Sequence, residues 1–443
     1  MKTKILGLNC SEGKKRMLDI KLIRERPEFV KDNLAKRNDP KVLKTLEEVI
    51  EADRSWRRLE TQLNELRHKR NEVSRHIATL RREGKDVQSE LRKAEAIAQE
   101  IARNEDEANE LANRVDYLLM RLPNILDEDV PYGKDENDNV VVRTWGQKPS
   151  FDFTPKDHLS ILLDLGLIDV ERGAKVAGER FYYYKKDLVL LEYALMDFAL
   201  RFMIERGYTP IEPPFMMNRR AYEGVTDLAD FENVMYKVEN EDLYLIATSE
   251  HPMAAMFMDE VLLRDELPMK FVGISPCFRK EVGAHGKYTK GLFRMHQFNK
   301  VEQFVFCTPE DSPKFHEELQ RNCEELYQRL GLHYRVVLVC TGDIGTVAAK
   351  KYDTEVWMAD GKYREVGSNS NCTDYQARRL NIRYRVKEGQ PPAGFVHTLN
   401  STALAMSRAL IAIIEQYQQE DGSVVIPEPL RKVMGRDRLE GVH

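Results

Sequence analysis

The sequence predicts an α+β protein in which a long, charged α-helical hairpin precedes a globular body of helices and short strands. Two observations predict this fold class. Residues 52–122 contain no proline and carry apolar positions at heptad spacing, whereas prolines and short β-like runs such as Val140-Val141-Val142-Arg143 follow Pro123. With 443 residues, of which 42% are hydrophobic and 32% charged, the chain can bury a substantial core and divide into two or more domains.

Composition excludes several classes of protein. No apolar run approaches the roughly eighteen residues that a membrane span needs, and residues 1–16 lack the apolar stretch of a secretory signal, so we expect a soluble, cytoplasmic protein without membrane partners. The six cysteines include no C-x-x-C pair, which argues against a disulfide framework and against a thiolate zinc site. The formal charge of −5 does not indicate a nucleic-acid binder, although a chain-wide sum can hide a local basic patch.

The hairpin is predicted from two heptad seams that meet at the polar turn 82–86, which contains Gly84. Folding the chain back there pairs the seams in antiparallel order. Arg70 and Glu105 interrupt the apolar seams, and we expect the aliphatic part of each side chain to lie on the seam with its charged group directed outward. At about 1.5 Å per residue the first helix is roughly 45 Å long from Asp53 to Arg82, and it should project into solvent. The expected seam positions are Trp56, Leu59, Leu63, Leu66, Arg70, Val73, Ile77 and Leu80 on the first helix and Val87, Leu91, Ala94, Ala98, Ile101, Glu105, Ala108, Ala112 and Val115 on the second.

Charge is unequal between the two predicted helices. Residues 54–82 hold nine Lys or Arg and three acids, whereas residues 86–120 hold four and nine. One interpretation is a solvated rod whose opposite charges pair across the helices. The other is a basic helix that lies along a polyanion, since each neutralised phosphate releases counterions. The residues leave both open; the contacts in the second case would be Arg57, Arg58, Arg67, Lys69, Arg70 and Arg75.

In the body, the amphipathic segment 187–206 is predicted to be a helix that runs into the strand 207–214, which prolines interrupt. Farther along, Thr248-Ser249-Glu250-His251-Pro252 follows a short strand. By itself this segment is typical of a helix N-cap with Pro252 in the first turn.

Two strand-like runs, 278–281 and 292–302, flank a loop punctuated by glycines. Strand alternation places Arg279 and Glu281 on one face and a second set on another. Arginines presented beside an aromatic ring suit a nucleotide, because guanidinium groups match phosphate oxygens; a hairpin with satisfied surface charges is the alternative. The second set is Arg294, His296 and Phe298, and the loop contains Gly283, Gly286, Lys287, Lys290 and Gly291.

Two further segments lie near the C-terminus. The polar run 365–371 could hold a hard cation through oxygen ligands. In the run 400–408, small residues lead into an apolar helix and could place Arg408 at a phosphate or a base; alternatively, Ser401 or Thr402 is only the cap of that helix. Neither G-x-x-x-x-G-K-[ST] nor G-x-G-x-x-G occurs, so a nucleotide would not be bound in the Walker or Rossmann manner.

Taken in order, these segments resemble the seryl-tRNA synthetase family of class II aminoacyl-tRNA synthetases, over residues 17–436. The stretch ending at 207–214 is similar to motif 1, 278–302 to motif 2, 400–408 to motif 3, and Thr248-Ser249-Glu250 to the serine-binding T-x-E loop. The resemblance implies an antiparallel-sheet catalytic domain at 126–443, a tRNA-binding domain with its coiled-coil arm at 17–125, and a homodimer. Residues 1–16 are an extension to which we assign no role.

The resemblance also implies a reaction: ATP-dependent ligation of L-serine to tRNA(Ser) through a seryl-adenylate, with Mg²⁺ as cofactor and tRNA(Sec) as a further family substrate. Phosphoryl chemistry of this kind depends on alignment and charge neutralisation. An amino acid:carrier-protein ligase on the same body and a non-catalytic paralogue are the competing interpretations. The long hairpin argues against the first, and the charged residues of the motifs argue against the second.

By resemblance, Arg279, Glu365 and Arg408 are the catalytic residues. Arg279 clamps the α-phosphate and the serine carboxylate, Glu281 reads the adenine amino group, and Phe298 with Arg408 encloses the adenine. Glu365 and Ser368 match the magnesium positions. The other implied ATP-binding residues are Lys280, Arg294 at the terminal phosphates, Met295, Val366 and Gly367. The implied serine-binding set is Thr248 and Glu250 at the ammonium, Glu302 and Thr402 at the hydroxyl, and Ser249 and Asn400.

Two positions depart from the family pattern. Ser407 stands where motif 3 often carries glycine, and Ser401 replaces a common glycine; both replacements are small. The implied hydroxyl contacts explain specificity, since alanine would leave buried polar groups unpaired, and threonine must be excluded by lack of room for its methyl group.

Overall fold

The computed structural model describes residues 19–226, 234–281 and 291–441. The extension 1–16 and the loop residues Gly283, Gly286, Lys287 and Lys290 lie outside this range. The chain divides into two compact units, Met1–Pro123 and Asn124–His443. None of the described helices combines the length and the apolar character that a bilayer crossing requires.

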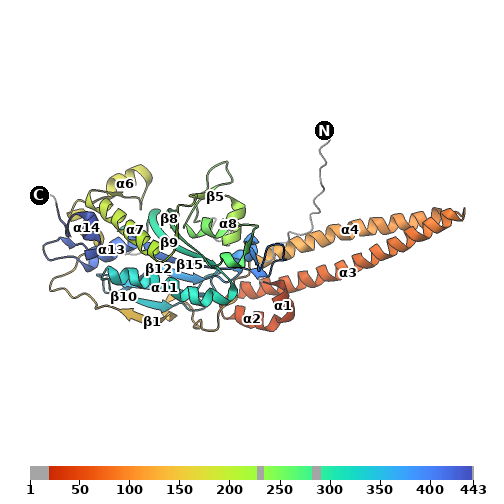
Figure 1. The fold of residues 1–443 in the computed structure, drawn as a ribbon, viewed down its shortest axis with the longest axis horizontal. Coiled ribbons are helices and arrows are strands. Elements are labelled where there is room, and N and C mark those ends of the chain that lie inside the picture. The colour runs from red at the N-terminus through yellow and green to blue at the C-terminus, as the bar shows by residue number, and fades with distance from the viewer. Residues whose placement is uncertain (1–18, 227–233, 282–290, 442–443) are drawn as a thin grey trace. The chain divides into compact units, whose positions relative to one another are not determined.

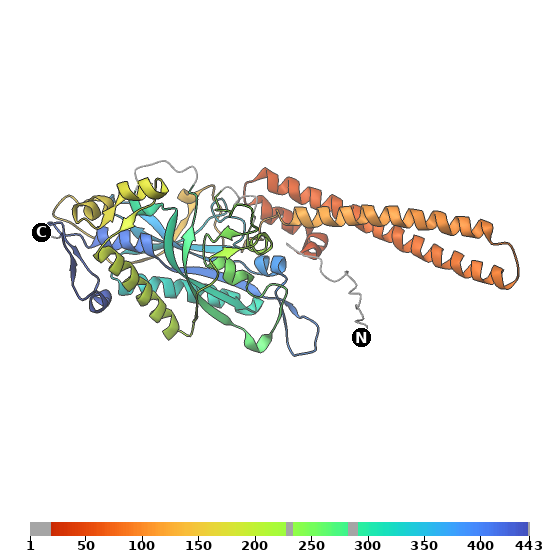
Figure 2. The same ribbon diagram turned by 90° about the horizontal axis from the view of Figure 1, so that it is seen from above.

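Four helices form the first unit: α1 Ile20–Glu25, α2 Pro27–Ala35, α3 Pro40–Arg82 and α4 Gln88–Leu119. Asp39 caps α3 by accepting a hydrogen bond from the amide of Lys41 at 2.9 Å, and Pro40 stands first in the helix, where its missing N–H costs nothing. Gly84 takes a left-handed φ of +68° between α3 and α4. The predicted hairpin is confirmed, and both views show α3 and α4 side by side up to this turn (Figures 1 and 2).

The hairpin core follows the predicted seam on α3 but not on all of α4. Its buried members are Leu59, Leu63, Leu66, Ile101 and Ala108. Ile97 and Leu111 also pack on this core, whereas Ala98 and Leu91, which we had placed on the seam, are exposed. At Ala98 the difference has a physical reason, because the adjacent Ile97 competes for the same seam position and its larger side chain buries more apolar area.

Several charges of the hairpin pair within the unit. Arg67 donates to Glu105 across the two helices at 2.8 Å. Arg57 and Arg24 both bind the buried carboxylate of Asp53, at 2.9 and 3.0 Å. Cross-helix pairing, one of the two interpretations of the charge asymmetry, is therefore part of the structure. Arg58 lies 3.6 Å from Glu51, and Lys69, Arg70 and Arg75 are exposed.

The second unit is built on an eight-stranded sheet in the order β1-β10-β11-β12-β15-β9-β8-β4, antiparallel except for the terminal pair β8 and β4. Its strands are β1 Val140–Trp145, β4 Thr209–Ile211, β8 Met269–Phe278, β9 Gln297–Cys307, β10 Tyr334–Leu338, β11 Lys350–Trp357, β12 Tyr363–Asn371 and β15 His397–Ala405. The short strands are β2 Ile168–Asp169, β3 Tyr183–Tyr184, β5 Met216–Met217, β6 Tyr244–Leu245, β7 Val261–Leu263, β13 Arg383–Arg385, β14 Gly394–Phe395, β16 Val424–Val425 and β17 Arg438–Leu439.

Helices flank this sheet, and the expected α+β class is confirmed (Figure 1). They are α5 His158–Asp164, α6 Val170–Ala177, α7 Asp187–Glu205, α8 Arg219–Val225, α10 Glu250–Ala255, α11 Ser312–Arg329, α12 Tyr375–Leu380, α13 Met406–Gln416 and α14 Glu428–Met434. As predicted, α7 runs into a strand that contains Pro210.

Strand β9 shows how the sheet separates its two faces. Val301 and Val305 join the core formed with α7, α11 and α13, while Phe304 and Phe306 join a second core with α8, α10 and α12. Lys300 and Glu302 share the side of the strand on which Phe304 and Phe306 lie, because alternate residues point to the same face. Both of these polar residues line a cavity.

Candidate active site

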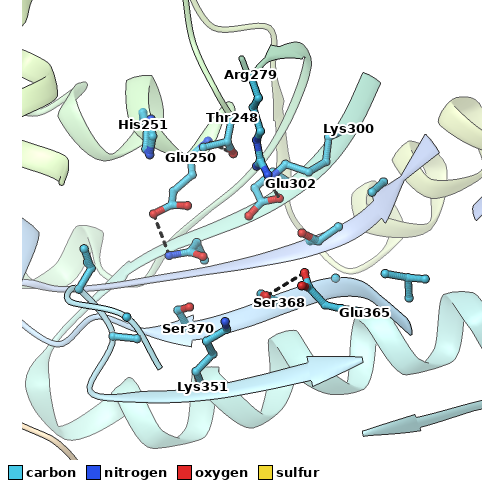
Figure 3. A pocket seen from close by; sticks show the side chains of 18 of the residues that line it. Thr248, Glu250, His251, Arg279, Lys300, Glu302, Lys351, Glu365, Ser368 and Ser370 are labelled. Carbon is cyan, nitrogen blue, oxygen red and sulfur yellow. Dashed lines mark hydrogen bonds and ion pairs between the residues drawn. The ribbon is translucent and has the colours of Figure 1, made fainter. Parts of the chain in front are cut away.

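A cavity of about 470 Å³ opens on this face of the sheet (Figure 3). Its walls come from the end of β8, from β9, β12 and β15, and from the first turns of α10 and α13. Fourteen predicted site residues line it: Thr248, Glu250, Arg279, Glu281, Met295, Phe298, Glu302, Glu365, Val366, Gly367, Ser368, Asn400, Thr402 and Arg408. Ser249, Lys280 and Arg294 do not.

Strand order brings these segments together. β12, β15, β9 and β8 are consecutive in the sheet, although their residues lie far apart in the chain. Thr402 of β15 stands directly opposite Glu302 of β9 in the antiparallel register. Directly opposed residues of such a pair have neighbouring side chains, so a hydroxyl and a carboxylate meet at the cavity floor.

Local structure at two segments decides the helix-cap alternatives. Helix α13 begins at Met406, its N-cap Ala405 makes no side-chain bond, and Ser401 and Thr402 lie inside β15. The cap interpretation of these two residues is therefore wrong. At α10, the N-cap Ser249 makes no side-chain cap bond, and the hydroxyl of Thr248 accepts from the Glu250 amide at 3.2 Å.

Glu250 forms the acidic end of the cavity. One carboxylate oxygen accepts hydrogen bonds from the side-chain amides of Gln376 at 3.1 Å and Asn400 at 3.0 Å. Burial and the nearby Glu302 carboxylate raise the pKa of Glu250 to about 7. Near neutral pH the protonated and ionised forms of Glu250 are therefore both populated, and an approaching cation favours the ionised form.

Two neighbours of Glu250 complete this end. The hydroxyl of Ser249 is turned away and packs beside Gly273 of β8, which explains why this predicted residue is not in the wall. His251 lines the cavity, and burial lowers its pKa to about 3, so the imidazole is neutral.

Lys300 was missed by the sequence interpretation. Its ammonium lies 2.7 Å from the Glu302 carboxylate, and both side chains are buried at the cavity wall (Figure 3). The sequence could have indicated this residue, because Lys300 and Glu302 are two residues apart on one strand and therefore lie on the same face. The lysine balances a carboxylate that would otherwise be buried alone.

Arginines and aromatic rings form the other end. The Arg279 guanidinium lies 5.3 Å from the ring centroid of Phe298, and its Nε donates to the Ala247 carbonyl at 3.2 Å. Arg408 lies 4.8 Å from the ring of Phe293, which the sequence interpretation had not selected. Each cation thus faces an aromatic ring at the partly exposed cavity wall.

The prediction that Glu281 and Arg294 lie on different faces of the 278–302 hairpin is wrong. Arg294 donates to the Glu281 carboxylate at 3.0 Å, although alternation had placed the two on different faces. The rule fails because β8 ends at Phe278, β9 begins at Gln297, and a 3-10 turn Gly291–Phe293 lies between them. Glu281 itself has a left-handed φ of +47°.

Lys280 does not line the cavity. Its amide donates to the Val234 carbonyl at 2.8 Å, and its ammonium lies 5.8 Å from the Tyr236 ring. Neither partner lines the cavity, so the side chain is not positioned at the predicted nucleotide site.

Glu365 stands on β12 among cations. Its carboxylate lies 3.1 Å from the Arg408 guanidinium, and its backbone carbonyl accepts a hydrogen bond from the same guanidinium at 2.7 Å. Burial alone would raise the pKa of Glu365, but Arg408 and Lys351 outweigh it and lower that pKa. Glu365 is therefore ionised.

Ser368 connects Glu365 to a neighbouring strand. Its hydroxyl donates to Asp353 of β11 at 2.6 Å and lies 3.3 Å from Glu365. Lys351, also unselected from sequence, lines the cavity and pairs with Asp353 at 3.3 Å. Within the described ranges, no cluster of three His, Cys, Asp or Glu side chains could hold a metal alone. A carboxylate and a hydroxyl on one strand do fit a hard cation that takes its other ligands from phosphates or water.

One wall segment carried no sequence signal. Residues 344–348, between β10 and β11, border the cavity, as do Ser370 and Cys372. Backbone and small side chains dominate this segment, so residue types alone do not mark it as part of a site.

Comparison with known proteins places this geometry in a family. Residues 17–126 match the model of the seryl-tRNA synthetase N-terminal domain, and residues 235–417 match the tRNA synthetase class II core domain (G, H, P, S and T). A serine–tRNA ligase of Methanocella arvoryzae is 54% identical over 419 residues, which cover 94% of this chain and 99% of the relative.

Two solved structures are similar over nearly the whole chain. The seryl-tRNA synthetase of Pyrococcus horikoshii complexed with ATP is 50% identical with a TM-score of 0.94, covering 96% of this chain and 100% of that chain. The cytoplasmic serine–tRNA ligase of Naegleria fowleri in complex with AMP is 34% identical with a TM-score of 0.88, covering 96% and 99%. Matched in both of its domains and at this identity, the chain belongs to the seryl-tRNA synthetase family.

Proposed function

We propose that the chain is a class II aminoacyl-tRNA synthetase that ligates L-serine to tRNA(Ser) in two steps. A serine carboxylate oxygen attacks the α-phosphorus of ATP, the bond to the β-phosphate oxygen breaks, and pyrophosphate leaves. A hydroxyl of the tRNA 3′-terminal ribose then attacks the carbonyl carbon of seryl-adenylate, loses its proton and displaces AMP. The observation that carries this proposal is the cross-strand pair Thr402 and Glu302 in the same cavity as Arg279 and Arg408.

The polar end of the cavity fits a zwitterionic, hydroxylated amino acid. Glu250 with Thr248 receives the ammonium, Arg279 the carboxylate, and Glu302 with Thr402 the hydroxyl. An approaching ammonium favours the ionised form of Glu250 and so offsets the burial that raises its pKa. Alanine would offer no hydroxyl to Thr402 or to the Glu302 oxygen that Lys300 does not bind, and these unmet hydrogen bonds in a buried setting reject it strongly.

The arginine end fits ATP. Arg279 holds the α-phosphate between substrates, Phe298 and Arg408 enclose the adenine, Glu281 receives the adenine amino group, and Arg294 meets the terminal phosphates once it is released from Glu281. The backbone of Met295, Val366 and Gly367 borders the nucleotide. Gly367 packs closely on β15, since an added Cβ would lie 3.0 Å from the Cβ of Thr402.

Glu365 and Ser368 are the residues that would hold Mg²⁺. Bound there, the ion neutralises phosphate charge. Arg408 now faces the Glu365 carboxylate, and a competing cation at this carboxylate would leave the arginine free to face the nucleotide.

The domain expected at residues 17–125 is proposed to bind tRNA through the basic face of α3, and the domain expected at 126–443 to hold the catalytic site. Of the six predicted contacts, Lys69, Arg70 and Arg75 are the most favourable, since they are exposed. Arg57 and Arg67 hold structural partners instead, Asp53 and Glu105.

A homodimer is proposed through α7. Leu190, Tyr193 and Ile204 on this helix are large apolar side chains with 51%, 61% and 44% of their surface exposed. Exposed apolar residues on one helix are typical of a protein interface. A cytoplasmic location follows from the proposed function, because charged tRNA serves ribosomes.

Serine-dependent ATP–pyrophosphate exchange tests the first step, and attachment of labelled serine to bulk tRNA tests the second. We expect both activities from the full chain with Mg²⁺. Exchange that is absent, or that another amino acid supports better than serine, would refute the proposal.

A further inference from the structure

A buried histidine–glutamate pair lies behind the nucleotide end of the cavity and has no role in the reaction described above. His158 opens α5 and is 2% exposed, and Glu415 lies in the last turn of α13 and is fully buried. The His158 Nδ1 lies 2.7 Å from the Glu415 carboxylate. Neither side chain lines the cavity.

Hydrogen bonds at both ring nitrogens fix the imidazole. The amide of Leu292 donates to Nε2 of His158 at 3.2 Å, so Nε2 carries no proton and Nδ1 donates to Glu415. Glu415 also accepts the His158 amide at 3.0 Å and the Ala359 amide at 2.8 Å. The carboxylate is therefore anchored independently of the turn that contains Leu292, and it holds the ring in one orientation.

The 3-10 turn Gly291–Phe293 is packed directly on this imidazole. Gly291 has a φ of +72°, and a Cβ added there would lie 2.5 Å from His158 Nε2. Helix α13 and this turn are in contact, and so are α5 and the turn. His158 thus connects the helix to the turn at a point where residue 291 has no room for a side chain.

The last residue of this turn belongs to the active site. The ring of Phe293 lines the cavity and lies 4.8 Å from the Arg408 guanidinium. Arg408 and Glu415 stand on the same helix, seven residues apart, which places them on one helix face. Helix α13 therefore contacts the turn at two points: Glu415 acts through His158, and Arg408 faces Phe293.

We propose that His158, oriented by Glu415, is a positioning residue for ATP: its bond to the Leu292 amide fixes the turn that presents Phe293 to Arg408. The inference rests on the proposed function. It assigns His158 to the nucleotide and not to serine, because the hydrogen bonds of the pair lead to Leu292 and Ala359, and the turn presents Phe293 to Arg408 at the nucleotide end.

The test measures KM for ATP and for serine by pyrophosphate exchange. His158→Ala leaves the Leu292 amide without its acceptor, and we expect the ATP KM to rise about tenfold while the serine KM changes less than about twofold. His158→Gln, whose amide oxygen can reach the Leu292 N–H, should recover most of the loss. His158→Asn, which can reach Glu415 but not Leu292, should not recover this loss. If the alanine variant fails to fold, the comparison of the asparagine and glutamine variants tests the role of the Leu292 bond.

A matched control is His333→Ala. His333 is also buried and is bonded at both ring nitrogens, to the Trp145 carbonyl at 2.8 Å and the Tyr363 hydroxyl at 2.6 Å, but none of these residues lines the cavity. This variant should lower the melting temperature and leave the ATP KM unchanged.

A double-mutant cycle with Phe293→Leu separates positioning from general destabilisation. If His158 acts through Phe293, His158→Ala should change the ATP KM less than about twofold in the Phe293→Leu background. Independent, multiplicative effects, or equal rises in both KM values for His158→Ala, would overturn the inference while wild-type exchange remained intact. Absence of serine-dependent exchange in the wild type would instead refute the proposed function.

Discussion

Glu250→Gln should make the free protein more stable at alkaline pH. The pKa of Glu250 is raised to about 7 from an ordinary value of 4.5, so the folded protein holds this proton more tightly than the unfolded chain does. The stability from that proton is fully present below pH 4.5 and is lost as the pH rises through 7. The glutamine can keep its carbonyl oxygen on Gln376 and Asn400 and carries no charge to desolvate, so it escapes this loss.

The size of the effect follows from the shift. At 1.36 kcal/mol per unit, the full difference corresponds to about 3 kcal/mol, and the solvent in the adjoining cavity reduces the expected value to about 1–2 kcal/mol. For a domain of this size that is a rise in melting temperature of roughly 2–4 °C at pH 8.5 relative to wild type, and close to none at pH 4.5. Melting curves of both proteins across this range measure it, since every other titrating group is shared.

The exposed Glu239→Gln is the control and should show no such divergence. A stability difference between Glu250→Gln and wild type that stays constant from pH 4.5 to 8.5, or that favours the wild type more strongly as the pH rises, would refute the reasoning. The same variant should raise the serine KM about 10–100-fold, because a charge-assisted hydrogen bond to the substrate ammonium is lost.

Three further predictions concern specificity, the arm and the turn. Thr402→Val should raise the serine KM about 5–30-fold and leave the ATP KM within about twofold, since only a hydroxyl contact to serine is removed; equal effects on both KM values would remove the hydroxyl assignment. Deletion of residues 57–112 should spare serine-dependent pyrophosphate exchange and abolish aminoacylation, and unimpaired charging by the truncated protein would contradict the role of the arm. Gly291→Ala should lower stability by about 2–3 kcal/mol more than Gly435→Ala, because both glycines have a left-handed φ but only the Cβ at 291 meets His158; melting curves that fall equally for the two variants would show that the contact is not limiting.

The hairpin shows what periodicity can and cannot predict. Leu59, Leu63 and Leu66 are isolated apolar positions among charged ones, so the seam on α3 could be read directly from the sequence. On α4, Ile97 and Ala98 are adjacent and both fit a heptad, and only packing against α3 decides between them. A pattern predicts the face of a helix well, but it leaves the register uncertain by one residue wherever two neighbours are apolar.

The site shows a different limit. Thr248, Arg279, Glu302 and Arg408 could be selected because each stands in a recognisable segment. Lys351 could not, because its position in the wall depends on β11 lying beside β12, and strand order is a long-range property that local residue types do not encode. The 3-10 turn before β9 is a second feature that local residue types did not predict. It interrupts the strand alternation, and Arg294 therefore contacts Glu281.

Glu250 and Glu365 are both carboxylates of the cavity wall, and their environments shift their pKa values in opposite directions. Burial and the Glu302 carboxylate raise the pKa of Glu250 to about 7 despite its amide partners, so an arriving cation shifts it toward the ionised form. Glu365 already lies among Arg408 and Lys351, so it is ionised before any ligand binds. Serine binding at neutral or acidic pH must therefore release a proton from Glu250, which should weaken serine affinity below pH 7. ATP binding requires no such step, because the opposite charges at its end of the cavity are preformed.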